Sequence, residues 1–116
     1  MTTVLFEPNH TGEFKVSEAK GYRSRVEAVV ASGNDLAAGA VVQEVGGEYV
    51  PIVDGGTEPV GVLYAAVDAT NEASAGVVFL RDAEVALERL TFPDTFDQAM
   101  INAAVARFEA QGVIVV

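Results

Sequence analysis

The residues Val60-Gly61-Val62-Leu63-Tyr64-Ala65-Ala66-Val67 are apolar throughout, and this stretch decides the fold. A half-buried strand alternates apolar and polar side chains, whereas an uninterrupted apolar run of this length indicates a strand covered on both faces. Polar loops flank the run, from Asp54 to Pro59 and from Asp68 to Ala75. The sequence therefore predicts that residues 60–67 form the central strand of a β-rich core.

Shorter β-rich runs stand on both sides of this strand. Ala40 to Val45 and Glu48 to Val53 are joined by Gly46-Gly47, and glycine takes the positive φ angles of a tight turn, so this pattern predicts a β-hairpin. Further strands are predicted for residues 25–31, 76–81, 83–90 and 113–116. The last of these runs consists of four β-branched residues and needs a sheet to receive it.

One helix is predicted, over residues 95–111. Thr95 followed by Gln98 has the form of a capping box, and Gly112 is placed to end the helix. Apolar residues recur along one side at helical spacing, namely Phe96, Met100, Ile101, Ala104, Val105 and Phe108. No basic residues border this stripe, so we expect it to pack on the protein's own sheet and not on a membrane.

Length and charge narrow the function classes. The chain has 116 residues, enough for one domain, and carries 17 acidic and 7 basic side chains, a net charge of −10. Such a polyanion is not expected to bind nucleic acid or an anionic membrane. There is no cysteine and a single histidine, which excludes disulfides, thiolate metal sites and His-rich zinc sites. We therefore expect no metal and no cofactor.

The charge also divides the chain into two parts. Residues 1–28 carry four acids and four bases, whereas the remaining 88 residues carry 13 acids and three arginines. Pro8 to Gly12 has turn chemistry, and the apolar residues before position 25 are too sparse to form a core. The sequence thus predicts an N-terminal arm, residues 1–24, followed by a β-rich domain, residues 25–116.

Three acids near the central strand raise an enzymatic alternative. If Asp54, Glu58 and Asp68 converged in a cleft, with at least one raised pKa, they could support hydrolysis. Isolated loop acids without a partner His or Lys are more often solvated surface residues. We therefore expect no catalytic residues, and the protein is not expected to be an enzyme.

The ordered set of segments resembles the lambda D-like family of bacteriophage head decoration proteins. The segments that carry the resemblance best are Pro59-Val60-Gly61-Val62-Leu63, Arg81-Asp82-Ala83-Glu84-Val85 and Leu90-Thr91-Phe92-Pro93, with Phe6-Glu7-Pro8-Asn9 and Gly12-Glu13-Phe14-Lys15-Val16 before them. The match runs over nearly the whole chain. Phe92 stands where relatives commonly carry Trp, and the stretch 94–111 is a longer helix than in the lambda member.

The resemblance implies a fold and a function. The fold is mainly β (α+β): a small β-clip-like, bent-ribbon or barrel domain with one C-terminal helix and an extended N-terminal arm. The implied function is that of a structural cement that sits on the outer surface of a tailed-phage head as a homotrimer and stabilises the expanded shell. Such a protein is made in the host bacterial cytoplasm and becomes part of the virion.

The resemblance also implies two sets of site residues. The N-terminal arm would pair with the major capsid protein, an expectation that falls on Leu5, Phe6, Glu7, Pro8, Phe14 and Val16. The corner Phe92-Pro93 is the expected trimer contact. The alternative left open is a small trimeric β-rich module that binds a ligand or another protein and is unrelated to capsids.

Overall fold

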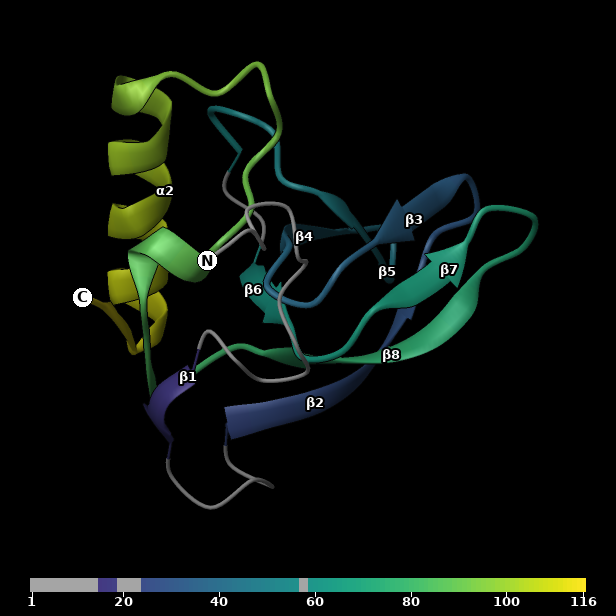
Figure 1. Ribbon diagram of the computed structural model, residues 1–116, viewed down its shortest axis with the longest axis horizontal. Coiled ribbons are helices and arrows are strands. Elements are labelled where there is room, and N and C mark those ends of the chain that lie inside the picture. The colour runs from purple at the N-terminus through teal and green to yellow at the C-terminus, as the bar shows by residue number, and fades with distance from the viewer. Residues whose placement is uncertain (1–14, 19–23, 57–58) are drawn as a thin grey trace, which may run out of the picture.

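The structure is a computed structural model that describes residues 15–18, 24–56 and 59–116, and for residues 16–18 it describes the backbone (Figure 1). Outside this part of the chain lie the acid Glu58 and the arm residues Leu5, Phe6, Glu7, Pro8 and Phe14. The described strands are β1 (Lys15–Glu18), β2 (Arg25–Val30), β3 (Asn34–Leu36), β4 (Val41–Val45), β5 (Glu48–Pro51), β6 (Val60–Leu63), β7 (Val67–Ala69), β8 (Ser74–Phe79), β9 (Ala83–Val85) and β10 (Val113–Val115). A 3-10 helix, Leu87–Arg89, and the helix α2, Gln98–Gln111, complete the fold.

Five strands close into a small barrel in the order β2-β5-β4-β6-β8. All neighbours are antiparallel except β2 and β5, which meet in parallel at Val30 and Tyr49. In Figure 1, α2 stands at one end of the molecule, and the β3–β7 pair projects at the other. The predicted mainly-β fold with a barrel and one C-terminal helix is confirmed.

Strand β6 separates two parts of the core. Val60 and Val62 pack in a cluster that includes Phe79 and Phe108, whereas Leu63 packs in a second cluster inside the barrel. All four residues of β6 are buried, so the expectation of a strand covered on both faces is confirmed for residues 60–63.

The predicted strand 60–67 is nevertheless too long, because the chain bends after Leu63. Tyr64 still donates its N–H to the Val77 carbonyl (2.8 Å), and the chain then leaves the barrel to form β7. There β7 pairs with β3 in a two-stranded sheet. In many strands, apolar and polar side chains alternate, and the strand ends where this alternation stops. Residues 60–67 are all apolar, so the sequence contained no sign of the bend after Leu63.

The β4–β5 hairpin forms as predicted. Gly46 and Gly47 both have positive φ, 61° and 88°, and Val45 pairs directly with Glu48. Both turn positions use a left-handed conformation that a side chain would strain.

A second sheet, β1-β9-β10, receives the C-terminal strand. β10 lies parallel to β9, and β1 lies antiparallel on the other side of β9. The predicted strand 83–90 is corrected: β9 ends at Val85, and a 3-10 helix follows. The parallel pairing of β9 and β10 continues one step further, because the Val116 N–H donates to the Val85 carbonyl and the Leu87 N–H donates to the Val116 carbonyl, both at 2.9 Å.

The helix α2 begins later than predicted, and its N-cap is Asp97 instead of Thr95. The Asp97 carboxylate accepts a hydrogen bond from the Met100 N–H (2.9 Å), while the Phe96 N–H is already bonded to the Pro93 carbonyl in a preceding turn (2.9 Å). A carboxylate is a strong cap because it also faces the positive end of the helix dipole. Gly112 ends the helix as predicted, and Ala104 and Phe108 are the buried residues of its apolar stripe.

Two polar side chains of α2 fix the helix to the barrel. The Gln111 amide accepts from the Val60 N–H (2.7 Å) and donates to the carbonyls of Val60 (2.7 Å) and Leu80 (3.0 Å). One turn earlier, Arg107 donates to the Val53 carbonyl (3.2 Å) and to the buried Gln43 (3.4 Å). Arg107 and Gln111 share one helix face with Ala104 and Phe108, so this face is both apolar and hydrogen-bonded.

We expect Gln111→Ala to lower the free energy of unfolding by about 2–4 kcal/mol, because it leaves polar groups of the fully buried Val60 without a partner. Urea unfolding measures this. The control is Gln98→Ala, which removes one hydrogen bond to Asn102 on the exposed side of the same helix. Equal urea midpoints for the two variants would show that the amide contributes little.

Candidate functional site

A groove of about 430 Å³ surrounds the predicted trimer contact, Phe92-Pro93. Its walls come from four separate segments of the chain: Asp35 and Leu36, Ala40 and Val41, Pro51, and residues 91–94. The segment that carries Phe92 is held in place by Thr91, whose N–H donates to the Gly39 carbonyl (2.9 Å) and whose carbonyl accepts from the Val41 N–H (3.0 Å). This corner is therefore anchored to the start of β4.

Phe92 joins the groove to the core. It is half-buried and stacks on Phe96, with ring centroids 5.8 Å apart and an angle of 27° between the planes. Two exposed acids, Asp35 and Asp94, also line the groove. An apolar cleft with acids beside it can accept an apolar side chain from a partner that brings a neighbouring cation. The sequence pointed to Phe92 and Pro93 but not to the opposite wall, because those residues lie more than 40 positions earlier in the chain.

The end of the predicted arm is part of a sheet. β1 pairs with β9 through Lys15 and Val85, Ser17 and Glu84, and Glu18 and Ala83. The register shifts between Lys15 and Ser17, which leaves Val16 at a bulge. Of the predicted arm contacts, Val16 thus lies on the backbone of a paired strand, and the other five lie outside the described residues.

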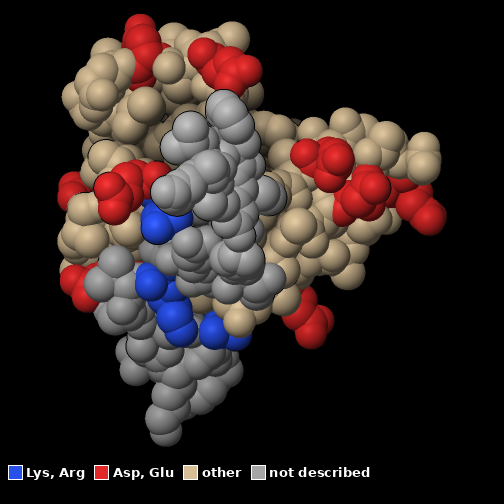
Figure 2. Space-filling view, viewed as in Figure 1, with Lys and Arg blue, Asp and Glu red and all other residues tan. Residues whose placement is uncertain are grey.

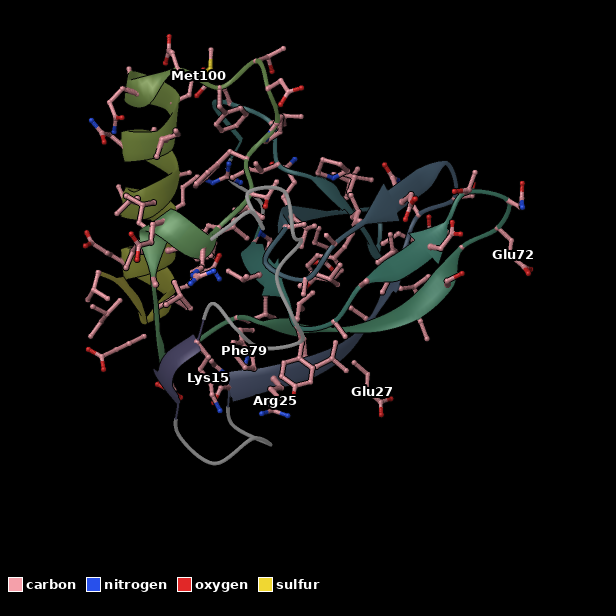
Figure 3. The ribbon with its side chains drawn as sticks, in the orientation of Figure 1. Lys15, Arg25, Glu27, Glu72, Phe79 and Met100 are labelled. Carbon is pink, nitrogen blue, oxygen red and sulfur yellow. The ribbon has the colours of Figure 1, made fainter. Side chains whose placement is uncertain are left out.

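The first residue of the predicted domain is fixed by aromatic contacts. The Arg25 guanidinium carbon lies 4.3 Å from the centroid of the Tyr64 ring and 5.3 Å from that of Phe79. Such contacts between a cation and an aromatic face stabilise both groups. Figure 3 shows Arg25 between Lys15 and Glu27 along one side of the molecule, next to Phe79.

The charged side chains are unevenly distributed over the surface. On the face in Figure 2, Lys and Arg gather toward the end where β1 and β2 lie, and Asp and Glu occupy the β3–β7 end and the upper edge. Acidic side chains also lie beside these basic ones on the side where α2 stands, so the two kinds of charge meet there.

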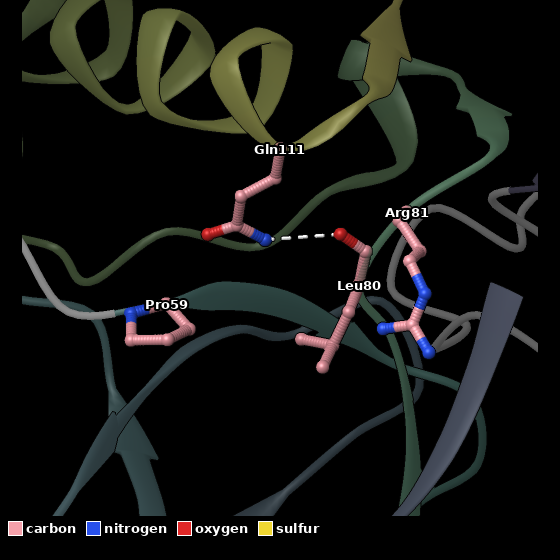
Figure 4. A pocket seen from close by; sticks show the side chains of 4 residues that line it. All are labelled: Pro59, Leu80, Arg81 and Gln111. Atoms are coloured by element: carbon pink, nitrogen blue, oxygen red, sulfur yellow. Dashed lines mark hydrogen bonds between the residues drawn. The ribbon is translucent and has the colours of Figure 1, made fainter.

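A second hollow, of about 440 Å³, lies where α2 ends (Figure 4). It is lined by Pro59, Leu80, Arg81 and Gln111. Figure 4 shows the Gln111 amide bonded to the Leu80 carbonyl, and its remaining hydrogen bonds go to Val60. The amide in this hollow is therefore a structural link between helix and barrel.

Of the three acids of the enzymatic alternative, Asp68 has surroundings that do not suit a general acid. Asp68 lies on β7, where Thr70 donates to its carboxylate through both the hydroxyl (2.6 Å) and the backbone N–H (3.1 Å). These hydrogen bonds lower the pKa of Asp68, the opposite of the raised pKa expected of a general acid. Asp54 is exposed in the turn after β5, and Glu58 lies outside the described residues.

Two further observations concern the described residues alone. No three of their His, Asp and Glu side chains are grouped so that they could hold a metal ion. None of their helices has the length and apolar character required to span a membrane.

A comparison with protein families decides the identity. The family described as Bacteriophage lambda head decoration protein D matches residues 4–113. The chain belongs to this family. No individually curated protein matches it. The resemblance read from the ordered sequence segments is therefore confirmed.

Membership defines the general function of the chain. It is a phage head decoration protein, a structural protein of the viral capsid, and the capsid is its binding partner. The alternative hypothesis, a binding module unrelated to capsids, is therefore wrong. The matched region includes both the segment before β1 and the Phe92-Pro93 corner.

We expect the double variant Asp54→Asn with Asp68→Asn to keep its stability and its capsid binding nearly unchanged, because both side chains are exposed. Each substitution should change the free energy of unfolding by less than about 0.5 kcal/mol. Thermal unfolding and capsid co-sedimentation measure the two quantities. A measurable hydrolytic turnover that the double variant loses would contradict the structural role.

Proposed function

We propose that this decoration protein binds the outer surface of a tailed-phage head as a homotrimer and stabilises the expanded shell. The observation that carries the proposal is the family match, because it begins at residue 4 and so includes the predicted arm. The arm residues Leu5, Phe6, Glu7, Pro8, Phe14 and Val16 contact the major capsid protein in this proposal, and neither nucleic acid nor membrane is a partner.

The pairing of β1 supports the proposal that the arm transmits force from the capsid to the body of the protein. The segment that ends at Glu18 pairs with β9, and β9 pairs with β10, which follows α2 directly. Force on the arm passes through the hydrogen bonds of the β1–β9 and β9–β10 strand pairs to the helix α2. The side chains of Gln111 and Arg107 then connect the helix to the barrel. An attachment distributed over many hydrogen bonds suits a protein that must resist expansion of a shell.

The charge distribution supports an orientation of the bound protein with its arm toward the capsid and its acidic body toward solvent. Residues 1–28 have zero net charge and the rest of the chain carries −10. With the arm toward the capsid, the acidic body faces solvent and keeps neighbouring copies soluble at high local density. Three arms in each trimer turn a modest affinity per arm into firm attachment through a high effective concentration.

The Phe92-Pro93 groove is the proposed trimer contact. A chain of 116 residues buries one modest core, and association covers the apolar surface that remains. The apolar lining of the groove, which the Thr91 hydrogen bonds hold at the start of β4, is the surface that a second subunit would cover.

We expect sedimentation of the purified protein to give three times the chain mass of 12.1 kDa. Phe92→Ala should shift the protein toward monomer, because it removes an apolar wall of the groove. Since Phe92 also packs on the core, Asp94→Arg serves as the matched variant: it changes the exposed groove lining and leaves the core intact. Trimers that persist in both variants would place the subunit contact elsewhere.

We expect deletion of residues 2–14 to leave a folded trimer that no longer stays on capsids. This deletion spares β1, whose pairing with β9 a longer deletion would remove. The measurement is the number of copies bound to expanded, undecorated capsids of the same phage. Ordering the arm costs about 1–2 kcal/mol per residue, so the contacts that it makes must exceed this cost.

The double variant Leu5→Ala with Phe6→Ala tests the same element without truncation and should weaken binding in the same direction. If the truncated trimer binds as tightly as the intact protein, the body carries the interface and the arm does not.

A further inference from the structure

Strand β2 has one paired edge and one edge that is largely open within the described part of the chain. On one side, all six of its residues pair with β8. On the other side, β5 meets it at a single position, where Val30 faces Tyr49 and the Ala31 N–H donates to the Tyr49 carbonyl (3.0 Å). No strand of residues 15–18, 24–56 or 59–116 lies beside the stretch before Val30 on that edge. This stretch of β2 therefore offers unpaired backbone groups with which a strand from another chain can form hydrogen bonds.

The pairing geometry identifies the open backbone groups. The Leu80 N–H donates to the Ser24 carbonyl (3.0 Å), so the even-numbered residues of this stretch direct their backbone groups toward β8. The odd-numbered residues Glu27 and Val29 direct theirs the opposite way. In the parallel bridge between Val30 and Tyr49 the Val29 carbonyl accepts from the Tyr49 N–H, so the open groups are both backbone groups of Glu27 and the N–H of Val29. Both side chains are exposed, with Val29 at 40 %, so the edge is accessible to a partner.

A groove of about 320 Å³ runs beside this edge. Its walls come from β2, β4, β5 and β8 and the turn between β4 and β5, and they include Glu27, Val29, Glu44, Tyr49 and Ala75. Two carboxylates thus line a hollow whose other walls are apolar or aromatic. Such a site favours a cationic side chain with an aliphatic stem.

Tyr49 provides an independent indication of a ligand. The residue is 6 % exposed, and it lines the groove. Burial raises the pKa of Tyr49, and the nearby Glu44 carboxylate raises it further, so the hydroxyl stays neutral. Among the described residues the hydroxyl has no hydrogen-bond partner, and its oxygen is the solvent-accessible end of an otherwise buried side chain, so it can accept a hydrogen bond in the groove.

We propose that the open edge of β2 binds an extended segment of the capsid protein that carries a lysine or arginine. The segment adds a strand to β2 through the backbone N–H and carbonyl of Glu27 and the N–H of Val29. Its cation enters the groove between Glu27 and Glu44, and donates to the Tyr49 hydroxyl oxygen. Main-chain bonds supply affinity in this mode, and the side-chain pocket supplies specificity. This inference rests on the proposed function and adds a second contact to that of the arm.

The capsid protein fits this edge better than a second copy of the chain does. Of the described cations, all but Arg81 already make an interaction within the chain. An antiparallel pairing of two β2 edges centred on the open stretch would also place Glu27 opposite its own copy, which like charges disfavour. In the view of Figure 3, Lys15, Arg25 and Glu27 follow one another along one side of the molecule.

Capsid binding by full-length variants tests the pocket. Glu27→Lys should speed dissociation from expanded capsids about tenfold, because it repels the incoming cation. Tyr49→Phe keeps the buried ring and should speed dissociation severalfold. The control is Glu72→Lys, the same charge change at an exposed position near the far tip (Figure 3), which should leave dissociation unchanged. Equal dissociation for Glu27→Lys and Glu72→Lys overturns the proposal.

Hydrogen exchange tests the added strand directly. The amides of Glu27 and Val29 should exchange rapidly in the free protein and at least about tenfold more slowly on the capsid. Slow exchange in the free trimer that is lost on dilution to monomer would mean that a second copy occupies the edge. Rapid exchange in both states would mean that nothing does. Either result overturns the proposal.

The arm deletion separates the two levels of inference. If that deletion abolishes binding while Glu27→Lys has no effect, the β2 site is wrong and the proposed function stands. If neither change affects binding, the proposed mode of capsid attachment fails as well.

Discussion

The structure depends on one requirement: the backbone of β6, buried on both faces, must be hydrogen-bonded along its whole length. β4 supplies partners along one edge and β8 along the other, but β8 ends before it reaches Val60. There the Gln111 amide takes the place of a strand and bonds both backbone groups of Val60. Gly61 allows the chain at Leu80 to lie close against β6, because a Cβ at this position would lie 2.9 Å from a Leu80 methyl carbon.

The position of the helix follows from this requirement. Gln111 reaches Val60 only if α2 lies along the barrel, and this placement buries Phe108 and Ala104 against Val62 and Phe79. Gly112 then turns the chain so that β10 runs beside β9. The segment between β9 and α2 must cross the barrel to reach the helix, and its crossing carries Phe92 and Pro93 to the edge of the groove.

In the proposed mode of binding, the two sheets provide two different attachments to the capsid. The β1-β9-β10 sheet receives the end of the arm and joins it to the helix. Within the described residues the barrel leaves the first part of the β2 edge open, because β5 begins at Glu48, one residue before its bridge to Val30. A closed barrel resists deformation, while an arm and an open strand edge can both bind extended segments. A decoration protein needs this combination of a rigid body and adaptable contacts.

The sequence by itself determined the features that depend on neighbouring residues. The Gly46-Gly47 hairpin, the helix that ends at Gly112, the apolar strand at 60–63 and the order of family segments could all be read locally. Tertiary structure alone decided where the 60–67 run bends, that β1 pairs with β9, and which residues face Phe92-Pro93. These features join segments far apart in the chain, and a pattern of neighbouring residues does not specify a distant partner.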